Sequence, residues 1–99
     1  MARRKLRRHD AADYVESAED AVHLLKAAFA DGDPGVIAEA IGAVARSRGM
    51  GKVAKSAGLS RESLYRALSA GGNPTLSTTL QVLDALGLRL SVTQRRRAA

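Results

Sequence analysis

The chain has 99 residues, the size of one small domain, and it contains no cysteine, which excludes disulfides and thiol chemistry. Its net charge is +6, and with only three aromatic residues its core must consist of aliphatic side chains, as in packed helices. No apolar run approaches the roughly 18 residues of a membrane span, and the basic N-terminus lacks the apolar stretch of a secretory signal. We therefore expect a cytoplasmic protein that does not contact a membrane.

Charge is unevenly distributed along the chain. Residues 9–45 contain eight acidic side chains and one basic side chain, a net charge of −7, whereas residues 46–66 contain six basic and one acidic, a net charge of +5. A polyanion would approach the second region, and a basic protein would approach the first. We interpret residues 10–93 as a single domain, flanked by a disordered basic arm (1–9) and a basic tail (94–99). Either extension could be a solvated tail or a nucleic-acid contact.

Apolar residues at helical spacing predict two helices in the first half of the chain. The first begins at Ser17, which resembles a capping box with Asp20, and "DGDPG" ends it. Asp33 caps the second helix, in which Pro34 is the first residue, and Gly49 ends it.

Three more helices complete an all-α fold with five helices. Residues 50–57 form the third, and the fourth starts after a cap at Ser60 and runs to about Ser69. Thr75 caps the fifth, which ends at Gly87. The apolar residues expected on its inner face are Leu76, Leu80, Leu83 and Leu86. The following "LRLSVT" alternates like a strand, which would need a partner strand from another chain or from the N-terminal region; the alternative is that no strand forms.

Residues 50–69 meet the requirements of a helix-turn-helix, in which the first helix crosses the DNA backbone and the second enters the major groove. Ala54 is small where the two helices would touch, Gly58 tolerates a positive φ in the turn, and Leu59 and Leu64 are apolar anchors. The simpler interpretation is a solvent-facing helix pair in a small bundle, but the joint pattern favours DNA binding.

Burial of Leu64 leaves the polar side chains of the second helix facing outward. Arginine suits guanine, glutamate accepts from cytosine, and hydroxyls reach bases or phosphate, while lysines and arginines nearby suit the DNA backbone. The expected base-reading residues are Ser60, Arg61, Glu62, Ser63 and Arg66. The expected backbone contacts are Arg46, Arg48, Lys52, Lys55 and Tyr65.

The chain also resembles a known family through a series of short motifs. These are "DAADYV" (10–15), "GDP" (32–34), "ARSRGM" (45–50), "GLSRESLYRALS" (58–69), "GNPT" (72–75) and "LDALGLRL" (83–90). They are similar to those of addiction-module antidote proteins in the lambda-repressor-like (Xre/Cro) helix-turn-helix family. The resemblance implies a bacterial antitoxin that neutralises a small basic toxin of the RelE/ParE superfamily and represses its own operon as a dimer on double-stranded operator DNA.

Two contact surfaces are expected on this interpretation. The acidic first helix would bind the toxin through Tyr14, Glu16, Glu19, Asp20 and Asp31. Because specific DNA binding normally uses two half-sites, we also expect a homodimer, with Leu88, Leu90 and Val92 and the fifth helix as candidates for its contact.

We found no pattern of catalytic, cofactor or metal-binding residues. His9 and His23 are the only histidines, and Ser60 and Ser63 have no nearby base to activate them. Two rival functions remain: a stand-alone Xre-type regulator without a toxin, and a protein-interaction module that has lost DNA binding. A small basic protein encoded next to this gene would favour the antitoxin, and the arginines of the fourth helix argue against the interaction module.

Overall fold

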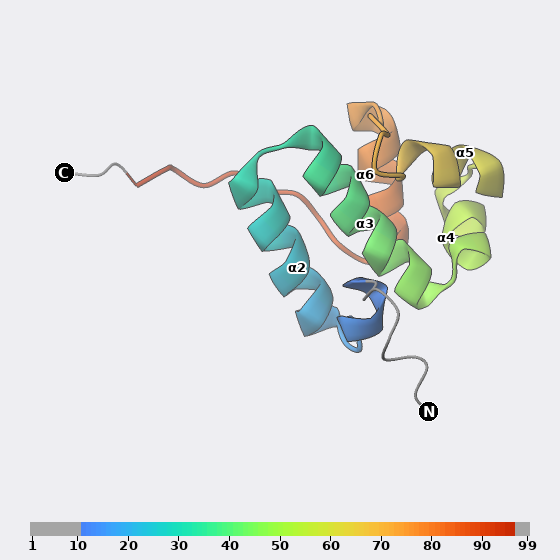
Figure 1. Cartoon of the computed structure of the whole chain (residues 1–99), viewed down its shortest axis with the longest axis horizontal. Helices are drawn as coiled ribbons and strands as arrows, with labels where there is room; N and C mark the ends of the chain where they lie inside the picture. The colour runs from blue at the N-terminus through green and yellow to red at the C-terminus, as the bar shows by residue number, and fades with distance from the viewer. Residues whose placement is uncertain (1–10, 97–99) are drawn as a thin grey trace.

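The computed structural model describes residues 11–96, and this part of the chain is all-helical, as the sequence predicted. A 3-10 helix, η1 (Ala11–Tyr14), is followed by the five α-helices shown in Figure 1. These are α2 (Ala18–Asp31), α3 (Pro34–Arg48), α4 (Met50–Ala57), α5 (Arg61–Ala67) and α6 (Leu76–Ala85). Helix α3 lies between α2 and the α4–α5 pair, and α6 packs against α4. Residues 1–9, which we interpreted as a basic arm, and residues 97–99 of the basic tail lie outside the described residues.

Short polar side chains start the two longest helices where the sequence predicted. The Ser17 hydroxyl accepts the backbone N–H of Asp20 at 3.1 Å, and the Asp20 carboxylate accepts the N–H of Glu16 at 2.9 Å. The capping box is therefore present, but its carboxylate binds the residue before the cap instead of the cap itself. Asp33 accepts the N–H of Gly35 at 2.8 Å, as an N-cap does.

The core consists of aliphatic side chains, many of them alanines, and among the described residues no polar or charged side chain is buried. Ile41, Val44, Leu64 and Val82 are its largest fully buried members. Small residues let the helices approach closely. Helix α3 comes very close to the end of α5 at Gly42, where a Cβ would lie 2.7 Å from the backbone carbonyl oxygen of Leu68.

The prediction of which leucines of the last helix face the core is partly wrong. Leu83 and Leu86 are buried together with Val82, but Leu76 and Leu80 are 68% and 45% exposed. Leu76 is the first residue of α6, and the buried residues of this helix all lie in its C-terminal half or just after it. The first half of α6 therefore carries an apolar surface that no part of the described chain covers.

Residues 88–96 form no regular secondary structure within the described chain, and a strand that pairs with a second chain stays a prediction. Helix α6 ends at Ala85, Gly87 follows with a φ of 79°, and the Leu88 N–H donates to the Leu83 carbonyl at 2.8 Å. This Schellman-type ending turns the chain back along the helices. The segment forms no β-strand because no second strand of the described chain lies beside it to form a ladder.

Two smaller differences concern the ends of elements. The sequence analysis missed η1, which packs against α3, and α5 ends at Ala67, two residues earlier than predicted. Within the described residues, no helix has the length and apolar character needed to cross a membrane.

Candidate nucleic-acid interface

Helix α4 presents one face to the core and the other to solvent. Met50, Val53, Ala54 and Ala57 are buried, and they follow the i, i+3, i+4, i+7 spacing of a single helix face. The two lysines of α4 lie on the opposite, exposed face. Burial of the apolar face therefore fixes Lys52 and Lys55 as a basic outer surface.

A single glycine sets the angle between α4 and α5. Gly58 has φ 75° and ψ 28°, the left-handed conformation that glycine adopts without a steric penalty. Its N–H donates to the carbonyl of Lys55 at 3.2 Å, and the N–H of Leu59 donates to the carbonyl of Ala54 at 2.9 Å. Together these bonds form a Schellman motif, which ends α4 and points the chain into α5 two residues later.

Helix α5 is short and is held by its cap and by one buried leucine. The Ser60 hydroxyl accepts the N–H of Ser63 at 3.0 Å, which confirms the predicted cap. Leu64 is fully buried, and Leu68 is buried just beyond the helix end. Ala67 packs against the edge of the core, and the polar side chains of α5 stay outside it, as the helix-turn-helix pattern predicted.

The five predicted base-reading residues lie at the cap of α5 and along this helix. Ser60, Arg61, Glu62, Ser63 and Arg66 are all exposed. The two serines already have partners in the free protein, because the Ser60 hydroxyl also donates to that of Ser63 at 2.8 Å. The arginines and the glutamate are therefore the side chains with most freedom to meet a ligand.

Tyr65 lies beside one of these arginines. The guanidinium carbon of Arg61 is 5.5 Å from the centre of the Tyr65 ring, within the range of a cation–π contact. Sequence reasoning assigned Tyr65 to the DNA backbone and did not foresee this contact, although the i, i+4 spacing of the two residues was a signal for it. The ring supports Arg61 on the exposed side of α5.

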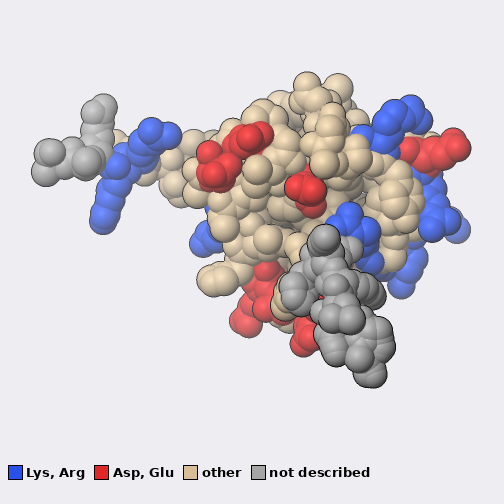
Figure 2. All heavy atoms as spheres, viewed as in Figure 1, with Lys and Arg blue, Asp and Glu red and all other residues tan. Residues whose placement is uncertain are grey.

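The surface around α4 and α5 is basic. Lys and Arg gather over this side of the molecule, with some acidic atoms among them (Figure 2). Arg46 and Arg48, at the end of α3, are exposed and add to this surface. Arg48 has a second contact: its Nη1 donates to the backbone carbonyl of Leu86 at 3.4 Å, joining the ends of α3 and α6.

The predicted acidic surface is only partly brought together. Glu16, Glu19 and Asp20 lie within five residues at the start of α2, close in sequence to Tyr14, which is 61% exposed. Asp31 is the last residue of the same helix. Twelve helical residues separate it from Glu19, a distance of about 18 Å along the axis. Only the first four residues can therefore form one contiguous contact.

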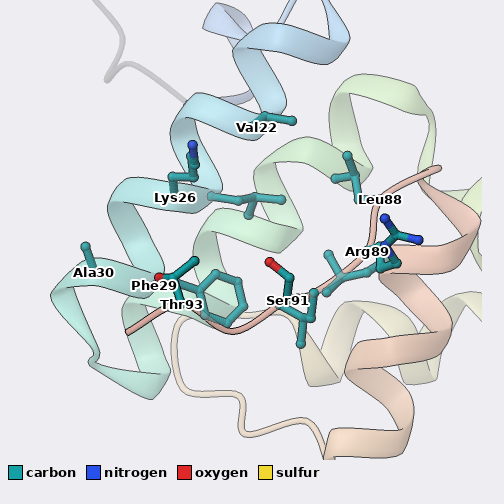
Figure 3. A pocket seen from close by; sticks show the side chains of 11 residues that line it. Val22, Lys26, Phe29, Ala30, Leu88, Arg89, Ser91 and Thr93 are labelled. Atoms are coloured by element: carbon teal, nitrogen blue, oxygen red, sulfur yellow. The ribbon is translucent and has the colours of Figure 1, made fainter. Parts of the chain in front are cut away.

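A groove, which no pattern in the sequence predicted, lies between α2 and the extended C-terminal segment. Its volume is about 490 Å³. One wall is α2, with Val22, Lys26 and Phe29, and the other is the segment that includes Leu88 and Leu90 (Figure 3). Val92, the third residue predicted for a dimer contact, is 96% exposed.

The described residues contain no group of three His, Asp or Glu side chains that could hold a metal ion. His23 is exposed on α2.

Comparison with known proteins places the chain in a family. Residues 5–94 match the model of a family described as "Probable addiction module antidote protein", and the chain belongs to that family. It is similar to an uncharacterized protein of Haemophilus influenzae, with 39% identity over 92 residues, which are 93% of this chain and 95% of the relative. No solved structure matches the chain. The antidote family expected from the short motifs is thus confirmed.

Proposed function

We propose that this member of the antidote family is the antitoxin of a type II toxin–antitoxin module. It neutralises a small basic toxin of the RelE/ParE type and represses its own operon through sequence-specific binding in the major groove. It would do so with a lambda-repressor-like helix-turn-helix formed by α4 and α5, as a homodimer in the bacterial cytoplasm. The proposal includes no catalytic step and no cofactor.

The observation that carries the DNA-binding proposal is the surface of α5. A seven-residue helix presents Arg61, Glu62 and Arg66 to solvent, while Leu64 anchors it from behind. Residues 46–66 around it have a net charge of +5, which attracts a phosphate backbone. An α-helix fits the major groove, and bidentate arginines distinguish guanine there.

The toxin-binding proposal rests on the family and on charge. Residues 9–45 have a net charge of −7, and the exposed start of α2 concentrates several of these acids. A basic toxin would be attracted to this surface, on a different part of the chain from the DNA-binding helices. One molecule could thus bind both partners through surfaces of opposite charge.

DNA binding is tested on the duplex upstream of the protein's own gene, against a scrambled duplex, at two salt concentrations. Arg61→Ala and Arg66→Ala should each weaken specific binding about 5- to 150-fold, the equivalent of 1–3 kcal/mol, and relax base preference. Lys26→Ala is the matched control, since this exposed lysine lies on α2, away from α5. Retention of wild-type specific affinity by both arginine variants would refute the assignment of α5 to base recognition.

Toxin binding is tested with the small basic protein encoded beside the gene. Glu19→Lys should weaken the complex, whereas Glu39→Lys, the same change on the exposed side of α3, should not. Equal affinity for both variants would remove α2 from the toxin interface. Specific DNA binding without any such toxin partner would instead favour the stand-alone regulator.

A further inference from the structure

We propose that two copies of this chain associate by pairing their C-terminal segments, residues 88–93, antiparallel, each segment filling the α2 groove of the other copy. This deepens the homodimer of the proposed function, because it names the surface, the direction and the register of the contact. The groove, the alternation of the segment and the acidic start of α2 all support this pairing.

The C-terminal segment has an unpaired backbone. No hydrogen bond joins the backbone of residues 89–96 to another described residue. An extended segment with free N–H and C=O groups readily adds a second strand beside it. A two-stranded ribbon is marginal alone, so it needs an apolar surface to pack on. The groove beside the segment supplies that surface through Val22, Leu25 and Phe29.

The groove and the segment that would fill it belong to the same chain. A two-fold interface requires this arrangement, since each copy must present both the receiving surface and the inserted one. The groove is apolar on its α2 side, and Leu88, Leu90 and Val92 alternate along the segment. The almost complete exposure of Val92 leaves it available for a partner copy.

The pairing centred on Ser91 gives a favourable register. In antiparallel strands it places Leu90 opposite Val92 of the partner subunit, an apolar pair on one face. It places Arg89 opposite the partner's Thr93. A register shifted by two residues, so that it is centred on Val92, would place Arg89 opposite the partner's Arg95, and like charges directly opposite are destabilising.

The direction of the segment brings opposite charges together. The segment runs in the same sense as α2, from Leu88 on the Val22 side to Thr93 beside Phe29 and Ala30 (Figure 3). The antiparallel copy therefore runs toward the acidic start of α2.

The distances along both elements agree with this charge contact. From Ser91 to Arg95, four extended residues advance about 13 Å. From Lys26, near the middle of the groove, to Glu19, seven helical residues span about 10 Å. Arg95 and Arg96 of the partner subunit would therefore meet Glu19 and Asp20. Within α2 the one Lys or Arg is Lys26, which lies six residues after Asp20 in the sequence.

The absence of cysteine from the chain makes the register directly testable. Directly opposite residues of an antiparallel pair have Cα atoms about 4.5–5.5 Å apart, within disulfide range. Ser91→Cys should thus form a disulfide-linked dimer under mild oxidation. Thr93→Cys is the matched control, because the two copies of residue 93 would be about 13 Å apart along the ribbon. Cross-linking of Thr93→Cys as fast as Ser91→Cys, or no cross-linking of Ser91→Cys, overturns the register.

The contact itself is tested by sedimentation equilibrium of the full chain without DNA. Val92→Asp should weaken self-association about tenfold or more without changing the melting temperature of the monomer, because the side chain has almost no contact there. Leu76→Asp, which alters the exposed start of α6, should leave self-association unchanged. A monomeric wild type overturns the proposal, and so does a dimer that Leu76→Asp disrupts and Val92→Asp does not.

A charge exchange tests the contact with α2. Arg95→Glu should weaken the dimer several-fold, and adding Glu19→Lys should restore it, because the pair is then reversed. Failure of the second change to restore the dimer overturns this contact. Arg61→Ala should dimerise like the wild type, so that loss of the dimer and loss of DNA recognition are separate results. Since Glu19 also belongs to the proposed toxin surface, toxin and dimer would compete there.

Discussion

A single methyl group added at Gly42 should disturb the packing of α3 against α5, one of the two helices proposed to bind DNA. In Gly42→Ala the new Cβ would lie 2.7 Å from the Leu68 carbonyl oxygen and 3.3 Å from the Leu68 Cβ. The first distance is too short for real atoms, and a backbone oxygen at the end of α5 moves only if α5 moves with it. The substitution must therefore push α3 and α5 apart by a few tenths of an ångström.

The expected size of the effect follows from two opposing contributions. Overpacking of this kind costs about 1–3 kcal/mol. Replacing a helical glycine by alanine gains up to about 1 kcal/mol of helix propensity. We expect Gly42→Ala to lower the free energy of unfolding by about 1 kcal/mol. For a domain of this size this lowers the melting temperature by roughly 4–8 °C.

A matched control separates the contact from helix propensity. Gly51 is also helical, in the first turn of α4, but a Cβ there would have no other atom within 4 Å. Gly51→Ala should therefore keep or raise stability, by up to about 0.5 kcal/mol. Thermal unfolding followed by circular dichroism compares the two variants. If Gly42→Ala melts at or above the temperature of Gly51→Ala, the close approach of α3 and α5 does not constrain this fold.

Three further changes test the interior, the cap and the basic surface. Leu64→Ala should cost about 2–5 kcal/mol in urea unfolding, because it leaves a cavity behind α5. Ser60→Ala should cost about 1 kcal/mol by the same assay, whereas Ser56→Ala, on the exposed face of α4, should stay within about 0.5 kcal/mol of the wild type. Lys52→Ala should weaken operator and scrambled DNA equally and lower the slope of log affinity against log salt by about 1, as measured by fluorescence anisotropy; an unchanged slope would remove Lys52 from the phosphate contacts.

The helix boundaries could be predicted from the sequence because they depend on neighbours within a few residues. Ser17, Asp33, Ser60 and Thr75 each accept a backbone N–H two or three residues ahead, and such bonds need no tertiary contact. The turn at Gly58 was predictable for the same reason. The exposed surface of α5 followed from these boundaries together with the burial of Leu64.

The predictions that failed depended on which element packs against which. Leu76 and Leu80 have the spacing of an inner face, but the buried residues of α6 are Val82 and Leu83, in its second half, and the start of α6 extends beyond the core. The alternation of "LRLSVT" is that of a strand, yet a strand exists only where a second one lies beside it. The groove on α2 depends on the path of the chain after Gly87, which periodicity does not encode.

The local caps and the order of packing also bear on how fast this protein folds. Helices that are neighbours in sequence pack together, α2 with α3, α3 with α4 and α4 with α5, while the contacts of η1 with α3 and of α4 with α6 span longer stretches of chain. Chains with mostly local contacts close short loops and fold in microseconds to milliseconds. The supply of folded molecules would then follow synthesis and degradation with almost no delay. In an antidote, the concentration available to a partner would track the rate of translation itself.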